Sequence, residues 1–145
     1  MKFVIQRVTE ASCTVDNQIT GEIKNGFCVL IGVAETDTRD IADKMIKKML
    51  QMRIFADDQG KTNLSLKDVD GNLLLISQFT LYGDCSHGNR PSFTLAERPE
   101  RAEPLYEYTI NCLKTYGVPV KKGVFGADMQ INQHGDGPVT ILLET

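Results

Sequence analysis

The 145-residue chain has no tryptophan, no long apolar run and no excess of basic residues. Its longest apolar runs, residues 27–31 and 73–76, fall far short of the roughly 18 residues that a membrane-spanning helix needs. Because 16 Lys and Arg face 19 Asp and Glu, the formal net charge is −3. That charge argues against non-specific binding of nucleic acid, but it allows a protein that holds one end of a nucleic acid with local basic residues.

Patterns of export, metal binding and several common enzyme classes are also missing. The first residues, MKFVIQR, turn polar too early for a signal peptide. The four cysteines form no Cys-x-x-Cys pair and, with two histidines, match no metal-ligand spacing. No Gly-rich phosphate loop, Gly-x-Ser-x-Gly or His-Glu-x-x-His motif occurs. We expect a cytoplasmic protein with reduced thiols, no metal and no cofactor.

What remains is a globular composition, 41% hydrophobic and 24% charged, without repeats or linkers, which favours one domain over residues 1–145. Apolar side chains at helical spacing predict a helix over residues 41–50, with its methionines in the core, and a second helix from Pro99 to Gly117. Asn25-Gly26 is a hairpin signal. Strands are predicted at residues 3–8, 11–15, 27–33, 73–81, 124–133 and 139–144. This pattern favours an antiparallel α+β protein over a doubly wound sheet.

The most informative strand is the one predicted at residues 73–81, because its apolar first half is followed by polar residues. Strand alternation places Ser77 and Phe79 on one face, and Gln78 and Thr80 on the other. A buried amide or hydroxyl without a partner costs about 1–3 kcal/mol, so these groups need partners. Neighbouring backbone and a bound ligand are both possible partners, and the pattern alone leaves the two open.

Two other segments are each open to a purely structural interpretation and to a functional one. Residues 135–140 contain Gly137-Pro138, which by itself predicts a tight hairpin turn. The loop at residues 84–91 holds Cys85 and His87, a possible thiol nucleophile and base, and His134 is an alternative base. The same loop composition is equally typical of a flexible surface connection.

Taken together, the motifs Ser77-Gln78-Phe79-Thr80-Leu81 and Gly137-Pro138-Val139-Thr140 resemble those of the D-aminoacyl-tRNA deacylases, also called D-tyrosyl-tRNA deacylases. The resemblance covers nearly the whole chain, and the order and spacing of its motifs are very specific. Further matches lie at residues 5–8, 53–55, 89–93, 105–108 and 125–130. One position departs from the family pattern Asn-Asp-Gly-Pro-Val-Thr, because Gly135 stands where the family usually has Asn.

The resemblance implies a homodimeric hydrolase that cleaves the ester between a D-amino acid and the 3′-terminal adenosine of tRNA. It also implies that Gly137 and Pro138, joined by a cis bond, enter the partner subunit's site. Their main-chain oxygens would meet the substrate ammonium and leave no room for an L side chain. Since glycine carries hydrogen at both α positions, we expect such a filter to admit glycyl-tRNA as well.

The resemblance assigns the catalytic segment to Ser77, Gln78, Phe79 and Thr80. Backbone N–H groups near Phe79 and Thr80 would stabilise the oxyanion. Thr80 would orient an attacking water, with or without help from the 2′-hydroxyl of the tRNA, because an unassisted threonine is a poor nucleophile. The substrate-binding residues would be Gly137, Pro138, Arg7, which supports their turn, and Phe125 and Met129, which flank the terminal adenine.

We therefore expect one α+β domain with layered β/β/α, barrel-like, mostly antiparallel sheets and two main helices. Its expected partners are the 3′ end of aminoacyl-tRNA and a second copy of the chain, without membrane or DNA. Two alternatives remain. One is a module that binds the tRNA end but has lost hydrolysis, and the other is a Cys/His thiol hydrolase acting on other esters.

Overall fold

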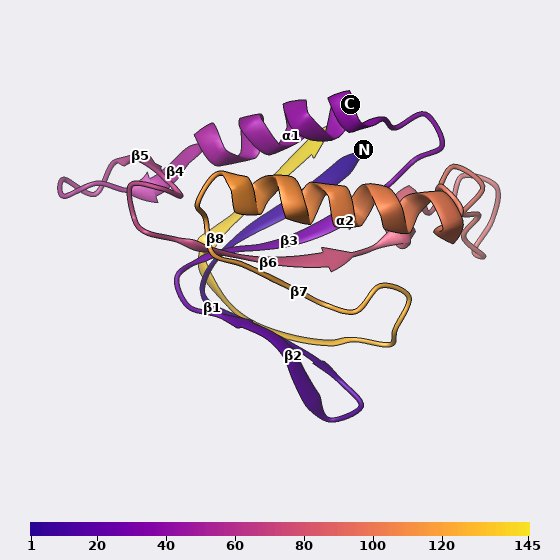
Figure 1. Cartoon of the computed structure of the whole chain (residues 1–145), viewed down its shortest axis with the longest axis horizontal. Helices are drawn as coiled ribbons and strands as arrows, with labels where there is room; N and C mark the ends of the chain where they lie inside the picture. Colours follow the sequence, from indigo (N-terminus) through magenta and orange to yellow (C-terminus); the bar gives the residue numbers. More distant parts are fainter.

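The sheet is organised around β1 (Lys2–Val15), which pairs with three strands in the computed structural model of residues 1–145 (Figure 1). Antiparallel to β1 run β2 (Gln18–Ile23), β3 (Gly26–Gly32) and β8 (Gln130–Glu144). From β3 the sheet continues in parallel through β6 (Asn72–Ser77) to β7 (Val120–Lys122). A separate antiparallel pair, β4 (Arg53–Ala56) and β5 (Thr62–Ser65), projects to one side.

The two ends of this sheet curl toward each other at Gly21 of β2. A Cβ atom added there would lie 2.9 Å from the backbone oxygen of Lys122 and 3.0 Å from a methyl carbon of Leu74. Strand β2 therefore lies directly against β7 and β6, although no ladder joins them. The predicted fold class is confirmed: a nearly closed, barrel-like, mostly antiparallel sheet with two helices.

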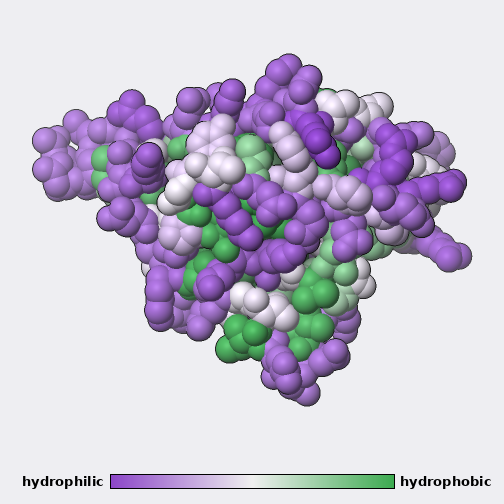
Figure 2. All heavy atoms as spheres, viewed as in Figure 1, coloured by the Kyte–Doolittle hydropathy of each residue, from purple (hydrophilic) through white to green (hydrophobic).

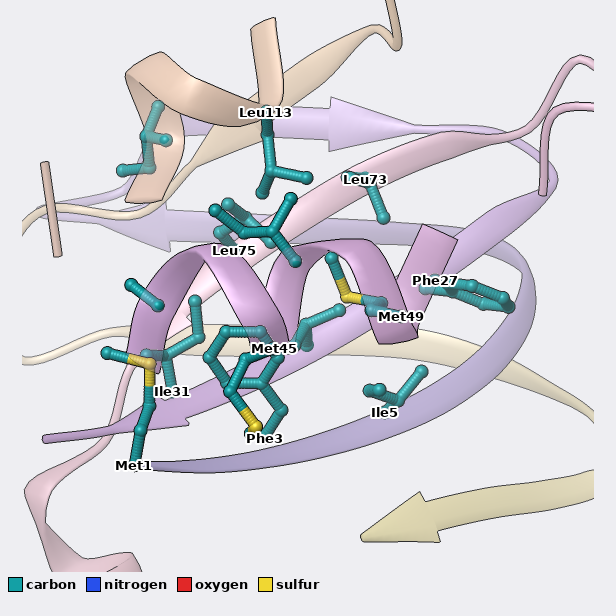
Figure 3. Close-up of a cluster of buried hydrophobic side chains, with 14 of the residues drawn as sticks. Met1, Phe3, Ile5, Phe27, Ile31, Met45, Met49, Leu73, Leu75 and Leu113 are labelled. Atoms are coloured by element: carbon teal, nitrogen blue, oxygen red, sulfur yellow. The ribbon is translucent and has the colours of Figure 1, made fainter. Parts of the chain in front are cut away.

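Both helices, α1 (Arg39–Gln51) and α2 (Pro99–Thr115), cover one face of the sheet (Figure 1). Helix α1 begins after Thr38, whose hydroxyl accepts the N–H of Ile41 as an N-cap. Its Met45 and Met49 point into the core, as the sequence predicted (Figure 3). Neither helix combines the length and apolar character needed to cross a membrane.

Strand β6 is buried on both faces, because it lies between two apolar clusters. Leu73 and Leu75 face the helices and join the larger cluster with Phe3, Phe27 and Leu113 (Figure 3). Leu74 and Ile76 point the other way, into a smaller cluster inside the curled sheet. Successive side chains of β6 point alternately into these two apolar clusters, so neither face of the strand needs polar residues.

Beyond Ser77 the chain leaves the sheet, so the predicted strand at residues 73–81 is too long. Its last ladder bond runs from the N–H of Gln78 to the oxygen of Ile31, 2.8 Å away, close to the end of β3. Without a neighbouring strand the chain turns into a short 3₁₀-helix, η1 (Phe79–Tyr82). The alternation predicted for Ser77, Gln78, Phe79 and Thr80 is therefore wrong after Ser77.

Two predicted turns are also wrong. Asn25-Gly26 joins β2 to β3, but both strands pair with β1, and the hairpin turn itself lies at Asp16-Asn17, where φ is 48° and 61°. Residues 135–138 lie within β8, because β1 continues to pair with β8 on both sides of them, with register shifts near Val8. Strand β8 begins at Gln130, six residues later than predicted. Strands β4, β5 and β7 were not predicted.

Candidate active site

A cleft of about 540 Å³ opens where β6 ends. Ser77, Gln78 and Phe79 of the predicted catalytic segment line it, and so do Phe125 and Met129, which the resemblance places beside adenine. The rest of its wall is mainly apolar and comes from β3, the loop before α2, α2 itself and the segment leading into β8. These residues are Ile31, Val33, Ile76, Phe93, Ala96, Glu97, Pro99, Ala102, Tyr106, Gly126, Ala127, Asp128 and Ile131.

Thr80 lies at the edge of this cleft rather than in its wall, because η1 turns it outward, where it is exposed. Its hydroxyl oxygen accepts a hydrogen bond from Nε2 of Gln78. Phe79 and Thr80 are the first residues of η1, so their N–H groups have no acceptor within that helix. Neither N–H finds an acceptor in the turns and loops of the chain. Two free amide donors therefore lie next to each other beside the cleft.

Aromatic side chains shape the cleft on two sides. Phe79 is 56% exposed and meets Phe93 edge-on, with 5.0 Å between ring centroids. On the other side Phe125 packs against Tyr106, with 5.8 Å between centroids. The Tyr106 hydroxyl donates to the oxygen of Leu75 at 2.8 Å, and burial raises the pKa of that hydroxyl well above its usual range. A fixed, protonated Tyr106 therefore sets the position of the Phe125 wall.

Sequence reasoning missed Phe93 and Glu97, which the loop between η1 and α2 brings to the cleft. A bridge between Ala34 and Ala96 attaches this loop to the chain after β3, and the N–H of Glu97 donates to the oxygen of Val33 at 2.9 Å. The Glu97 carboxylate is 7% exposed and pairs with Nε of Arg101 at 3.2 Å. The motif match at residues 89–93 was the available signal for this wall.

The thiol hypothesis finds no support in the geometry around Cys85. This cysteine is exposed and does not line the cleft. Nδ1 of His87 hydrogen-bonds the hydroxyl of Ser86 at 2.7 Å, and Nδ1 of His134 faces the carboxylate of Glu10 at 3.3 Å. Neither histidine forms a hydrogen bond with Cys85, so no base activates its thiol.

Arg7 holds the segment that contains Gly137. Its Nε donates to the backbone oxygen of Asp136 at 3.2 Å and pairs with the carboxylate of that residue at 2.9 Å. Its Nη1 donates to the oxygen of Ile54, and its guanidinium lies over the ring of Phe55, 5.9 Å from the centroid. Gly137 has a φ of +121°, its bond to Pro138 is cis, and both residues are exposed.

The two halves of the predicted site do not meet within one chain. Along β3, Arg7 is the neighbour of Phe27, whereas Ser77 is the neighbour of Ile31, four positions further on. At the usual rise of a strand this separates them by roughly 13 Å along the sheet. None of Arg7, Gly137 and Pro138 lines the cleft.

Comparison with known proteins identifies the family. Residues 4–144 match the model of the D-Tyr-tRNA(Tyr) deacylase family. The chain belongs to this family. Membership confirms the predicted family and makes the protein an enzyme of the deacylase class, a hydrolase.

Full-length relatives support this assignment. The chain is 50% identical over 145 residues to a D-aminoacyl-tRNA deacylase of Fervidobacterium nodosum, covering 100% of this chain and 97% of the relative. A D-aminoacyl-tRNA deacylase of Thermosipho melanesiensis is 48% identical over 146 residues, with the same coverage.

Solved structures share the fold. A c-Myc DNA unwinding element binding protein is 42% identical, with a TM-score of 0.94 over 100% of this chain and 99% of that chain. A probable eukaryotic D-amino acid tRNA deacylase is 17% identical, with a TM-score of 0.84 over 98% and 97% of the two chains, and supports the fold alone.

Proposed function

We propose that the protein hydrolyses the ester that joins a D-amino acid to the 3′-terminal adenosine of tRNA. The observation that carries this proposal is the pair of free N–H groups at Phe79 and Thr80 beside the cleft, in a chain of the deacylase family. Ester hydrolysis needs a positioned nucleophile and donors for the oxyanion that forms on the carbonyl oxygen. Two adjacent backbone donors meet the second need without any charged side chain.

Water is the nucleophile in this proposal. The Thr80 hydroxyl accepts a hydrogen bond from Gln78, and neither a histidine nor the cleft carboxylates Glu97 and Asp128 hydrogen-bond to it, so no side-chain base activates it. Water attacks the acyl carbon, the bond between that carbon and the ribose oxygen breaks, and a proton from water ends on the departing ribose oxygen. The products are the free amino acid and tRNA. Thr80 orients the water, and the 2′-hydroxyl of the tRNA is a second group able to relay the proton.

The terminal adenine is proposed to lie against Phe125 and Met129. Both side chains line the cleft and are half-buried, so they offer apolar surface to an aromatic base. The charged residues of the cleft wall are two carboxylates, Glu97 and Asp128. A wall of this charge suits an uncharged base and disfavours a phosphate.

Chiral selection is proposed to come from a second copy of the chain. Gly137 and Pro138 are exposed and lie away from their own cleft, yet Arg7 holds the residue before them. In a homodimer each Gly137-Pro138 segment enters the other subunit's cleft. There its main-chain oxygens receive the α-ammonium, and glycine without a Cβ lets the backbone approach closely. An L side chain would collide with this backbone, whereas a D side chain would not.

Hydrolysis of D-tyrosyl-tRNA beside L-tyrosyl-tRNA tests the proposal. We expect cleavage of the D ester alone, and a clear loss of rate in Thr80→Ala with Thr80→Ser retaining more activity. Cleavage of neither ester, with tRNA binding retained, would favour the module that binds the tRNA end without hydrolysis. Cleavage of both esters at equal rates would overturn the chiral filter.

Glycyl-tRNA is a second test of the steric filter. Because glycine has no side chain in either position, we expect measurable hydrolysis of glycyl-tRNA at saturating enzyme. Complete resistance of glycyl-tRNA would contradict a filter that works by collision. Analytical ultracentrifugation in the buffer of the hydrolysis assay checks the homodimer. A monomer that still discriminates D from L would contradict the cross-subunit arrangement.

A further inference from the structure

A groove of about 410 Å³ lies at the end of the helices opposite the cleft. It is formed by the last turn of α1, the start of β4, the connection from β5 to β6 and the residues after α2. The surface over β4 and β5, at this end of the molecule, is mainly hydrophilic (Figure 2). We name it the basic groove, after its residues Lys47, Arg53 and Lys67. Resting on the proposed function, we propose that the basic groove binds backbone phosphates of the tRNA whose 3′ end is being hydrolysed.

The charge of the groove differs in sign from that of the whole chain. Lys47, Arg53 and Lys67 face one carboxylate, Asp68, while the chain as a whole carries −3. None of the three cations takes part in an ion pair. Asp68 keeps its negative charge, because one of its oxygens accepts both the hydroxyl and the N–H of Ser65, at 2.7 Å and 2.8 Å. Three cationic side chains against this one carboxylate leave the basic groove with an excess of positive charge for an anion.

Arg53 is held in place for such a contact. Its Nε donates to the backbone oxygen of Asn63 at 2.7 Å, and its Nη2 donates to the side-chain oxygen of the same residue. This leaves Nη1 available, and a fixed guanidinium binds phosphate with little loss of freedom. The helix dipole favours a lysine near the C-terminus of a helix, and this explains the presence of Lys47 in the groove without any ligand. The dipole does not explain the presence of Arg53 and Lys67, because these two residues lie outside the helices.

The basic groove adjoins the segment proposed to enter the partner's cleft. Arg53 precedes Ile54, whose oxygen accepts Nη1 of Arg7, and Arg7 in turn holds Asp136 beside Gly137. Insertion of Gly137-Pro138 into the partner's cleft would therefore bring Arg53, which is linked to that segment through Ile54 and Arg7, toward the same cleft. The cleft itself offers no cationic side chain, so phosphates that leave it along the tRNA need cations outside it.

Two matched double variants test this proposal. Lys47→Gln with Lys67→Gln removes two charges from the basic groove, and Lys24→Gln with Lys121→Gln removes two exposed charges elsewhere. The measurements are the Kd of uncharged tRNA by fluorescence anisotropy over a salt series, and hydrolysis of D-tyrosyl-tRNA and of D-tyrosyl-adenosine, which has no phosphodiester.

We expect the groove variant to bind tRNA about five- to tenfold more weakly, with a salt slope lower by about 2, and the control to stay within about twofold. KM for D-tyrosyl-tRNA rises while kcat and the hydrolysis of D-tyrosyl-adenosine stay as in the wild type. Equal weakening in both variants, no weakening, or parallel loss on D-tyrosyl-adenosine would each overturn the proposal. A wild-type protein that binds tRNA through the groove but cleaves no D ester would instead overturn the proposed function and leave the groove standing.

Discussion

Gly135 and Gly137 lie two positions apart in β8, but their surroundings differ sharply. A Cβ atom added to Gly137 would lie 2.8 Å from a methyl carbon of Val139 and 3.2 Å from Nη2 of Arg7, at a φ of +121°. A Cβ atom added to Gly135 meets nothing within 4 Å. The position at which this chain departs from the family pattern is therefore the tolerant one, and the position proposed to filter substrates is confined.

Gly137→Ala is expected to destabilise the fold by about 1–3 kcal/mol, because its backbone conformation is strained for any L side chain. Hydrolysis of D-tyrosyl-tRNA should fall on the order of 100-fold, since the proposed filter shifts together with Arg7. Gly135→Ala is the control and should change stability by less than about 0.5 kcal/mol. Urea unfolding and steady-state kinetics measure both effects. Equal behaviour of the two variants would contradict the role given to Gly137.

The exposed Cys85 should react with thiol reagents very differently from the buried Cys13 and Cys28. Cys85 is exposed, whereas burial, with a smaller effect of Cys13, raises the pKa of Cys28 to about 11. A thiol-specific reagent at pH 8 should modify Cys85 in the folded protein and spare Cys13 and Cys28 until the chain unfolds, as mass spectrometry would show. Cys85→Ala should hydrolyse D-tyrosyl-tRNA at the wild-type rate. Loss of activity in that variant would revive the thiol hypothesis.

At the scale of elements, Tyr106 connects α2 to β6. The oxygen of Leu75 accepts both the Tyr106 hydroxyl and the N–H of Gly123, so one residue of β6 holds the helix and the chain that leads to Phe125. Because Phe125 packs on the Tyr106 ring, this connection also sets one wall of the cleft.

Tyr106→Phe should cost about 1 kcal/mol of stability, the usual value of one hydrogen bond, since Gly123 still satisfies the Leu75 oxygen. The exposed Tyr116 supplies the control, and Tyr116→Phe should leave stability unchanged. Thermal unfolding followed by calorimetry measures both. A loss well above 2 kcal/mol would mean that the hydroxyl does more than bond to Leu75.

Local sequence patterns predicted the elements whose burial pattern repeats along their own residues. They failed where pairing with a strand distant in sequence sets the end or the conformation of an element. The apolar run at residues 73–76 and the methionine stripe of α1 were predictable, because burial on a sheet or a helix face repeats along the sequence. The end of β6 was not, since it is set by the end of β3. Turn chemistry at residues 135–138 predicted a hairpin, but β8 pairs with β1 at Gly135 and again at Thr140, so the intervening residues form an irregularity within one strand.

The residues of the candidate site were also predictable only where a local motif marks them. The motifs at residues 77–80 and 137–140 marked segments that carry chemistry in the family. Nothing local in the sequence indicates that Glu97, a charged residue in a loop, is buried in the cleft wall, because its burial depends on contacts with Val33 and Arg101.

For the whole molecule, the free energy of unfolding should fall at alkaline pH, because the fold shields a cysteine thiol and a tyrosine hydroxyl from water in their protonated forms. Burial raises the pKa of Cys28 to about 11 and that of Tyr82 to about 12, from ordinary values of 9.0 and 10.0. The unfolded chain releases these protons first, so their contribution is complete below pH 9 and is lost as the pH rises toward 11 and 12. For Cys28 alone the loss is at most about 3 kcal/mol.

Urea unfolding between pH 8 and pH 11 checks this expectation. The free energy of unfolding should be level up to pH 9 and decline above it. Cys28→Ala should decline less between pH 9 and pH 10, before tyrosine ionisation takes over. Parallel curves for the two proteins would show that the Cys28 thiol is not the group responsible.

The pairing of β1 with β8 sets the order in which the enzyme is able to mature on the ribosome. Residues 2–14 pair with residues 130–144, so the first strand to be synthesised has no β8 to pair with until synthesis of the chain is complete. During that interval one long edge of β1 has no partner in its own chain, and an open strand edge is prone to pair with other chains. Contacts this distant in sequence also slow folding. Protection of the nascent amino-terminal strand, rather than the stability of the finished sheet, is therefore expected to limit the yield of this protein in a cell.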